Sequence, residues 1–373
     1  MKMGKNQPCW CGSGEKYKKC HLNRQEEEEI KLWEVEQSFK KAFGAKYCSV
    51  PANLKNECNG NIVKAHSVSK SMNLKKIERD GHVYAFIPSI KNLIKSHGLL
   101  RPELCGINKA STFTGFCAYH DKQIFLPIED QEFVGSKEQC FLLAYRAHAR
   151  EHFTKKCSSK LFDFMKQTDR GKSPHEQIYI QNIASAYSSG TEAGIRDGII
   201  YNKKFEAILT TRNFTNINAY IINFKKTPSV LCSAGIFPEY DFYGNHLQDV
   251  FDLDTTPDLL TFSTIVTTNG GAAVFTWLND DDNKGNCEKF IKSLKAITPD
   301  KITSSLIRFF FEFCENIFME PKWWESLEKS KQDSLISRVL SAASLLEVRN
   351  ANCLCDDNLS FDDWELINTR EIK

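Results

Sequence analysis

Residues 262–278 read FSTIVTTNGGAAVFTWL, which are two short apolar runs separated by a turn. The runs Phe262–Thr267 and Ala272–Leu278 have the composition of strands, and Asn269-Gly270-Gly271 between them predicts a tight hairpin. Two earlier segments, 217–224 and 230–236, are also strand-like. The sequence therefore predicts an antiparallel sheet in the C-terminal half of the chain.

Helical patterns lie on both sides of these strands. Helix signals dominate from Ser136 to about Tyr201, interrupted by a breaker at 169–174, and they return with dense apolar packing from Cys287. A further amphipathic helix is predicted at 26–43, with acidic residues in its first turn. These patterns predict the α+β class, with a helical layer packed on an antiparallel sheet.

One of the predicted helices carries a dense patch of polar side chains. Its members are Tyr145, Arg146, His148, Arg150, Glu151 and His152. A catalytic patch is one interpretation, but the spacing favours a salt-bridged helical face.

Length, charge and cysteine content limit the classes of protein that fit. A chain of 373 residues predicts two or three domains, and a net charge of +2 excludes a globally polybasic protein. No secretory leader and no membrane-spanning run is recognisable, so we expect a cytoplasmic protein without a membrane partner. In that compartment thiols stay reduced, and clustered cysteines among the fourteen more often bind metal than form disulfides. Cys353 and Cys355 have no second pair, and with Asp356 and Asp357 they indicate an exposed tail.

The N-terminal knuckle, residues 1–24, contains the sequence NQPCWCGSGEKYKKCH at 6–21. Three thiolates and one imidazole form the Cys3His ligand set of a closed tetrahedral zinc site. Gly12 and Gly14 permit the positive φ angles that such a tight turn requires. Because so short a segment cannot bury a stable core, the metal would supply most of its folding free energy.

These residues resemble the SEC-C motif, the zinc-binding tail of the SecA translocation ATPase that recurs in other bacterial proteins. The resemblance implies four zinc ligands, namely Cys9, Cys11, Cys20 and His21. In SecA the module docks onto a chaperone and the ribosome. This chain has no Walker-type loop, so the resemblance implies docking without an ATPase role.

The charge of the N-terminal knuckle bears on its partner. Residues 1–24 hold six Lys or Arg residues against one Glu, a net charge of +5, or about +4 with three thiolates and Zn²⁺. We expect this surface to contact nucleic acid or an acidic protein. A solvated surface, or pairing with the glutamates of 26–29, is the alternative.

A second set of metal-ligating residues lies between 48 and 121. Cys48 and Cys58 have nine residues between them, and Cys117 and His120 have the spacing of ligands in the first turn of a helix. Together they would form a second Cys3His zinc site. One alternative is that Cys48 and Cys58 are unpaired buried thiols. Another is that the zinc ion is purely structural and no catalytic ion binds.

The segments IVKAHSV (62–68) and FCAYHD (116–121) resemble a divergent HNH (ββα-metal, treble-clef) nuclease. The resemblance implies that His66 is the general base that activates water. A catalytic Mg²⁺ or Mn²⁺ ion would then be held by later positions, for which Asn108, His120 and Asp121 are the candidates. The sequence departs from the family in its wide first cysteine spacing and in Ser69, where a proline is common. A satisfied, hydrogen-bonded histidine is the alternative for His66.

The sequence thus predicts four regions. They are a zinc knuckle (1–24), a linker helix (25–45), a mixed cysteine and histidine region (46–135) and a helix-and-sheet body (136–373). The predicted function is zinc binding with docking to a macromolecule through the N-terminal knuckle. The alternative is a metal-dependent nuclease with His66 as base and Asp121 at its catalytic metal, so enzymatic activity stays open, as does the oligomeric state.

Overall fold

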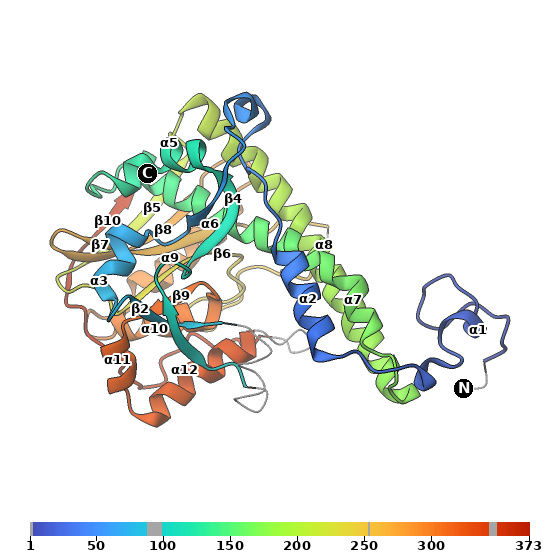
Figure 1. Ribbon diagram of the computed structural model, residues 1–373. Coiled ribbons are helices and arrows are strands. Elements are labelled where there is room, and N and C mark those ends of the chain that lie inside the picture. Colours follow the sequence, from blue (N-terminus) through green and yellow to red (C-terminus); the bar gives the residue numbers. More distant parts are fainter. Residues whose placement is uncertain (1–2, 88–98, 253, 343–348) are drawn as a thin grey trace. The chain divides into compact units, whose positions relative to one another are not determined.

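The computed structural model describes residues 3–87, 99–252, 254–342 and 349–373 (Figure 1). The chain divides into two compact units, each built from segments that are far apart in the sequence. The first unit combines Met1–Ala45 with Thr154–Arg196. The second combines Lys46–Phe153 with Asp197–Lys373.

The first unit is helical. It contains α1 (Tyr17–Cys20), the 3-10 turn η1 (Arg24–Glu26), α2 (Leu32–Phe43), the 3-10 turn η4 (Ser159–Leu161) and α7 (Phe162–Gln167). It also holds the end of α6 (Lys137–Ser158) and the start of α8 (Pro174–Thr211).

Helix α2 begins later than the sequence predicts. The prediction placed its start at Glu26, whereas the helix begins at Leu32. The glutamates before it form ion pairs instead, Glu27 with Arg24 at 3.1 Å and Glu29 with Lys172 at 2.6 Å. The Glu34 carboxylate then accepts a hydrogen bond from the Lys31 backbone N–H at 2.8 Å, which caps the helix at that point.

The second unit is built on a large sheet. Its strand order is β10-β5-β8-β7-β6-β9-β2-β3, and each neighbouring pair is antiparallel. The strands are β2 (His82–Phe86), β3 (Pro102–Gly106), β5 (Ile217–Phe224), β6 (Val230–Ile236), β7 (Leu260–Thr267), β8 (Gly270–Leu278), β9 (Ile317–Met319) and β10 (Leu366–Ile372). The four predicted strands are confirmed as β5 to β8.

The hairpin between β7 and β8 turns at Thr268 and Asn269, because Thr267 pairs with Gly270. Gly270 has a φ angle of +132°, and a Cβ atom there would lie 2.2 Å from the carbonyl oxygen of Phe224. Only glycine fits this position without displacing β5. The predicted turn is therefore confirmed, with Gly270 at the start of the second strand.

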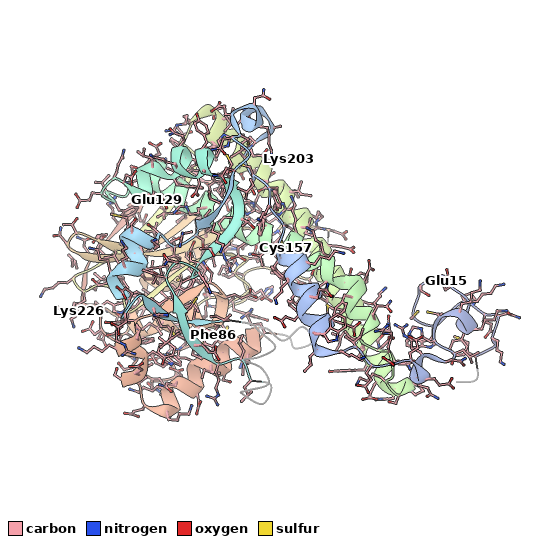
Figure 2. All side chains as sticks on the ribbon, viewed as in Figure 1. Glu15, Phe86, Glu129, Cys157, Lys203 and Lys226 are labelled. Carbon is pink, nitrogen blue, oxygen red and sulfur yellow. The ribbon has the colours of Figure 1, made fainter. Side chains whose placement is uncertain are left out.

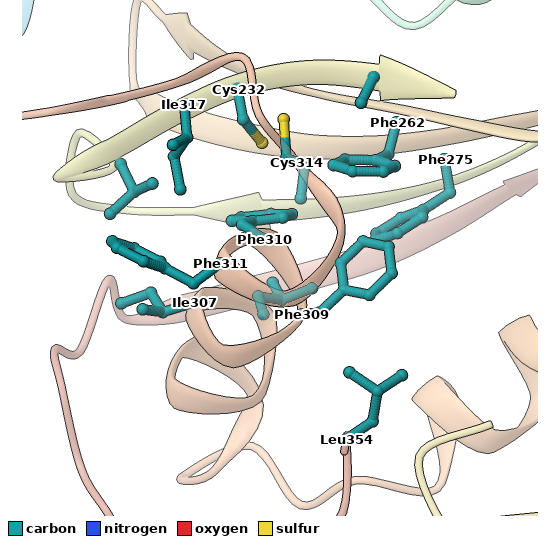
Figure 3. Packing of buried hydrophobic residues seen from close by; sticks show 14 of the residues in the cluster. Cys232, Phe262, Phe275, Ile307, Phe309, Phe310, Phe311, Cys314, Ile317 and Leu354 are labelled. Carbon is teal, nitrogen blue, oxygen red and sulfur yellow. The ribbon is translucent and has the colours of Figure 1, made fainter. Parts of the chain in front are cut away.

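Helices α9 (Asn286–Lys295), α10 (Ile302–Phe313), α11 (Pro321–Ser326) and α12 (Lys329–Ala342) supply side chains that pack with one face of this sheet. Phe262 of β7 lies 4.7 Å from Phe309 and 5.7 Å from Phe310 between ring centroids (Figure 3). At the β2 end, Phe86 (labelled in Figure 2) meets Phe311 edge to face, with 6.0 Å between ring centroids. This helical layer on an antiparallel sheet confirms the predicted α+β class.

A smaller element of the second unit is a hairpin followed by a helix. Strands β1 (Ile62–His66) and β4 (Thr112–Cys117) pair antiparallel, and α5 (Ala118–Glu129) follows β4 directly. Shorter pieces complete the unit, namely η2 (Ala52–Glu57), η3 (Lys70–Leu74) and α3 (Lys75–Ile77).

The polar patch of α6 is buried rather than a surface salt-bridge face. Tyr145, Arg146, His148 and His152 are each 6% exposed or less. The reason is that α6 packs inside the second unit, where the His148 ring stacks on Phe205 at 5.0 Å. The prediction of a salt-bridged face is met by two ion pairs, Arg146 with Glu129 and Arg150 with Glu151, but most of the face is buried.

The segment after residue 349 is also more tightly packed than an exposed tail. Leu354 and Trp364 are each 1% exposed, and Asp357 binds the fully buried guanidinium of Arg308. Cys353 and Cys355 are the neighbours of Leu354 in the sequence and are half-buried. Asp356 is exposed as predicted, but the segment as a whole is not an exposed tail, because the buried Arg308 binds Asp357 as a counter-ion.

No helix in the described ranges is both long and apolar enough to cross a bilayer.

Candidate metal centres

The N-terminal knuckle is held by backbone hydrogen bonds. The Cys9 N–H donates to the carbonyl of Glu15 at 2.8 Å, and the Gly12 N–H donates to the carbonyl of Cys9 at 3.2 Å. Gly12 and Gly14 have φ angles of +74° and +76°, which is the left-handed backbone expected from the sequence. Helix α1 then brings Cys20 to this turn, and His21 follows as its C-terminal cap.

Four ligand atoms converge in this knuckle, the first cluster. The sulfurs of Cys9, Cys11 and Cys20 and a ring nitrogen of His21 all lie within 4.8 Å of one another. The His21 Nδ1 atom is 3.2 Å from the Cys9 sulfur and 3.0 Å from the Cys20 sulfur. In a tetrahedral site with metal–ligand bonds of about 2.0 to 2.3 Å, ligand atoms are separated by roughly 3.3 to 3.8 Å. The first cluster can therefore hold one metal ion.

The other nitrogen of His21 binds a buried carboxylate from a distant part of the chain. The His21 Nε2 atom lies 2.8 Å from Oδ2 of Asp169, which is inaccessible to solvent. Arg24 and Gln181 also donate to this carboxylate, at 2.8 and 2.6 Å. Burial raises the pKa of Asp169, but these hydrogen bonds outweigh it and lower the pKa below its ordinary value. A metal-binding histidine needs such a partner on its second nitrogen.

The thiols of the first cluster differ in acidity. Burial raises the pKa of Cys11, but hydrogen bonds from Ser13 and the neighbouring thiols outweigh it and lower the pKa to about 7. Burial and the nearby sulfurs raise the pKa of Cys20 to about 12. Three thiolates at this spacing repel one another, so full deprotonation needs a bound cation.

A second cluster forms within the second unit. Cys48 and Cys58 lie on either side of η2, while Cys117 is the N-terminal cap of α5 and His120 lies in its first turn. The His120 Nδ1 atom is 3.6, 3.5 and 3.2 Å from the sulfurs of Cys48, Cys58 and Cys117. The ligand atoms all lie within 4.8 Å of one another, so this second cluster can also hold a metal ion.

The wide spacing of the second cluster in sequence has a structural explanation. Pro51 and the 3-10 turn η2 fold the chain between Cys48 and Cys58 back on itself. The Cys117 backbone N–H also donates to the Cys48 sulfur at 3.4 Å, a bond that orients a ligand. Burial and the adjacent thiols raise the pKa of Cys48 to about 11.

His66 is the last residue of β1, and Asp121 follows His120 in α5. The His66 Nε2 atom lies 3.2 Å from the carbonyl oxygen of Ile107, and burial lowers the pKa of His66. Burial raises the pKa of Asp121 to about 6, although the positive charge of Arg146 acts to lower it. Among the described residues, the buried Oδ1 of Asp121 has no hydrogen-bond partner.

Two other candidates for the nuclease positions are engaged elsewhere. Asn108 lies at the surface, where its amide oxygen accepts a hydrogen bond from Lys70 at 3.0 Å. The Nδ1 atom of His120 faces the three sulfurs. Sequence reasoning did not identify Asp169, Gln181 and Arg146 as neighbours of these sites, because no local pattern relates them to the ligands.

The geometry defines the first cluster as a compact Cys3His metal-binding module. Comparison with protein families is more specific: residues 6–23 match the SEC-C motif. The predicted resemblance is thus confirmed for this segment, while no comparison supports the HNH resemblance. No curated protein and no solved structure matches the chain.

Proposed function

We propose that the protein binds two zinc ions and uses its SEC-C module to dock onto a negatively charged macromolecule. The observation that carries the zinc assignment is the Asp169–His21 pair at the first cluster. Thiolate and imidazole ligands in a tetrahedral arrangement favour zinc, and a carboxylate on the outer histidine nitrogen stabilises such sites. All fourteen cysteines are free thiols, which fits a reducing, cytoplasmic compartment.

The docking proposal rests on the charge of the N-terminal knuckle. Lys5, Lys16, Lys18 and Lys19 are exposed. No ion pair of these four side chains occurs within the described part of the chain. The nearby glutamates do not neutralise them, because Glu27, Glu28 and Glu29 pair with Arg24, Lys31 and Lys172. The knuckle therefore presents a compact positive surface to an acidic protein or to nucleic acid.

Binding of the full chain to a short fluorescent oligonucleotide and to a polyglutamate peptide tests this proposal. Changing Lys16, Lys18 and Lys19 together to glutamine should weaken binding of the preferred probe about tenfold or more and reduce its salt dependence. The control changes Lys41, Lys292 and Lys322 to glutamine, which removes the same charge from exposed positions elsewhere. Equal binding by the two triple variants would contradict docking through the knuckle.

The second cluster supports a structural role for the second zinc ion. Its ligands join the loop around η2 to the N-terminus of α5. Strands β1 and β4 pair beside this site, with Ile62 opposite the ligand Cys117. A metal ion here would fix the hairpin and the helix as one element. Removal of zinc should therefore loosen the β1–β4 hairpin and the start of α5 before the large sheet unfolds.

A metal-dependent nuclease is the second candidate, and the orientation of His66 favours it. A carbonyl oxygen can only accept, so the contact with Ile107 requires a proton on Nε2 of His66. Because burial lowers the pKa, the neutral ring keeps a lone pair on Nδ1. A neutral histidine held in this tautomer suits a general base, and it stands at the end of β1 in a hairpin-and-helix element.

The catalytic ion fits this candidate less well. Asp121 offers one buried carboxylate oxygen, with Glu129 and Arg146 contributing to its electrostatic surroundings. Beyond the two Cys/His clusters, the described residues contain no other group of three such ligands. Cleavage of a supercoiled plasmid or RNA with Mg²⁺ or Mn²⁺, abolished in His66→Ala and retained in His82→Ala, would establish this function. Absence of cleavage by the wild-type chain would eliminate it.

A further inference from the structure

A cavity of about 720 Å³ lies within the second unit, on the sheet beside β1 and α6. Its walls come from the segment after β1, the connection between α5 and α6, and the β7–β8 hairpin. Ser233 and Ser263 form part of its lining, and they alternate along their strands with Cys232 and Phe262 of the aromatic core. The side chains of Ser233 and Ser263 therefore point away from that core, and Cys232 and Thr264 of the same strands also contribute to the lining.

Small polar side chains open this space. Ser233 and Ser263 are direct partners across β6 and β7, and their hydroxyl oxygens are 3.2 Å apart. Both are buried, at 2% and 5% exposure, in positions where a sheet interior usually carries bulky apolar side chains. The resulting volume falls in the range of about 300 to 1,000 Å³ that small-molecule sites occupy.

Arg146 is a buried charged residue of the cavity lining, at 2% exposure. Its Nη2 atom lies 3.0 Å from Oε1 of Glu129, an ion pair without hydrogen-bond geometry (Glu129 is labelled in Figure 2). Its guanidinium also packs over the ring of Phe125 at 4.0 Å. The buried Nε atom makes no hydrogen bond within the described residues. Arginine stays charged, and a buried donor without a partner lowers the stability of the fold. A ligand with an acceptor group would therefore be stabilised near this guanidinium.

The rest of the lining completes a mixed environment. Lys76 and Lys225 are exposed lining residues, and so are Asp130 and Glu132. Apolar lining residues are Val68, Met72, Phe133, Leu143, Ile265 and Val266. The exposed charges balance, which leaves Arg146 as the buried cation of the lining, paired with Glu129 and close enough to Asp121 to affect the pKa of that carboxyl. The apolar residues suit an organic body on that ligand.

We propose that this cavity binds a small organic molecule that carries an oxyanion, either a phosphate or a carboxylate. The oxyanion binds the guanidinium of Arg146 and accepts a hydrogen bond from the Ser233 hydroxyl, which itself accepts one from Ser263. The organic part contacts the apolar wall. This site is separate from both Cys/His clusters and does not depend on docking or on nuclease activity.

Isothermal titration of the zinc-loaded full chain tests the proposal with three probes. Adenosine monophosphate supplies a phosphate, citrate supplies carboxylates, and adenosine supplies neither. Binding of either anionic probe with at least tenfold preference over adenosine is expected, and the preferred probe identifies the anion. Arg146→Gln should weaken that binding about tenfold or more, while Arg150→Gln, one turn along α6, should leave it unchanged. No binding of either anionic probe, or equal binding by a folded Arg146→Gln variant, would overturn the proposal.

A second variant keeps the test decisive if Arg146→Gln fails to fold. Ser263→Leu fills the cavity with an apolar side chain and leaves the Arg146–Glu129 pair in place. We expect the Ser263→Leu variant to retain the circular dichroism spectrum of the wild type and to lose binding of the anionic probe. Unchanged binding by the folded Ser263→Leu variant would place the ligand elsewhere and overturn the proposal.

Discussion

The His21 Nε2 atom lies 2.8 Å from Oδ2 of Asp169, although 148 residues separate the two in the sequence. This contact fixes the ring so that Nδ1 faces the sulfurs of Cys9 and Cys20. It also ties the N-terminal knuckle to the turn before α8 within the first unit. The module is thus integrated with a helical support and is not an isolated appendage.

The first prediction concerns this carboxylate. Asp169→Asn should lower the zinc affinity of the first cluster about tenfold to a hundredfold, because the amide is a weaker partner for the histidine N–H. Competition with a chromogenic chelator measures the affinity, and the second cluster serves as an internal reference. Asp163→Asn, an exposed change in α7, is the matched control. If both zinc ions of Asp169→Asn are released as in the wild type, the carboxylate has no role in metal binding.

The second prediction is a pH dependence that belongs to His66. Burial lowers its folded-state pKa below the ordinary 6.5, so the unfolded chain takes up a proton first as the pH falls. His66 therefore destabilises the fold increasingly as the pH drops below 6.5 towards the folded-state pKa. His66→Gln should lose less unfolding free energy than the wild type between pH about 7.5 and about 5.5.

Urea denaturation at the two pH values measures this difference, with zinc held constant. His82→Gln, an exposed histidine on β2, should follow the wild type. The same pH dependence in His66→Gln and in the wild type would mean that burial does not perturb His66.

The third prediction concerns the aromatic core. Phe309 is fully buried between α10 and the sheet, so Phe309→Ala should reduce the unfolding free energy by about 3 to 5 kcal/mol. Phe39→Ala on α2 removes the same atoms from a side chain that is 44% exposed, and it should change stability by about 0.5 kcal/mol or less. A similar loss in both variants would contradict the observed packing.

The fourth prediction tests the anchoring of the C-terminal segment. Asp357→Ala removes a counter-ion from the buried Arg308 and leaves Asp356, at 3.4 Å, as its remaining carboxylate partner among the described residues. We expect a loss of about 1.5 to 3 kcal/mol in unfolding free energy, the range for a hydrogen bond to a charged group. Asp281→Ala in an exposed turn is the control. Two variants of equal stability would show that the segment is not anchored by this pair.

Much of the fold could be predicted because it depends on short-range patterns. The strands β5 to β8 follow from β-branched and aromatic runs, and the hairpin at Gly270 follows from its turn residues. The Cys3His geometry of the first cluster follows from ligands that lie within one short segment, residues 9–21. Cys117 and His120 also lie at the start of a helix, as their spacing indicates.

The remaining features depend on contacts that no local pattern contains. Asp169 was recognisable only as part of a helix breaker, and its contact with His21 arises when distant segments form one unit. Arginine side chains usually lie at the surface, but Arg146 is buried with α6, and Glu129 compensates its charge. The start of α2 was misplaced because glutamates that suit a first turn form ion pairs outside the helix.

Elemental analysis of zinc in the purified full chain tests whether both Cys/His clusters hold a metal ion. We expect two zinc ions per chain, one for each Cys/His cluster. We also expect one zinc ion per chain in Cys20→Ser and one in Cys117→Ser, since each variant loses a single site. A wild-type chain without zinc, or variants that keep both ions, would contradict the account.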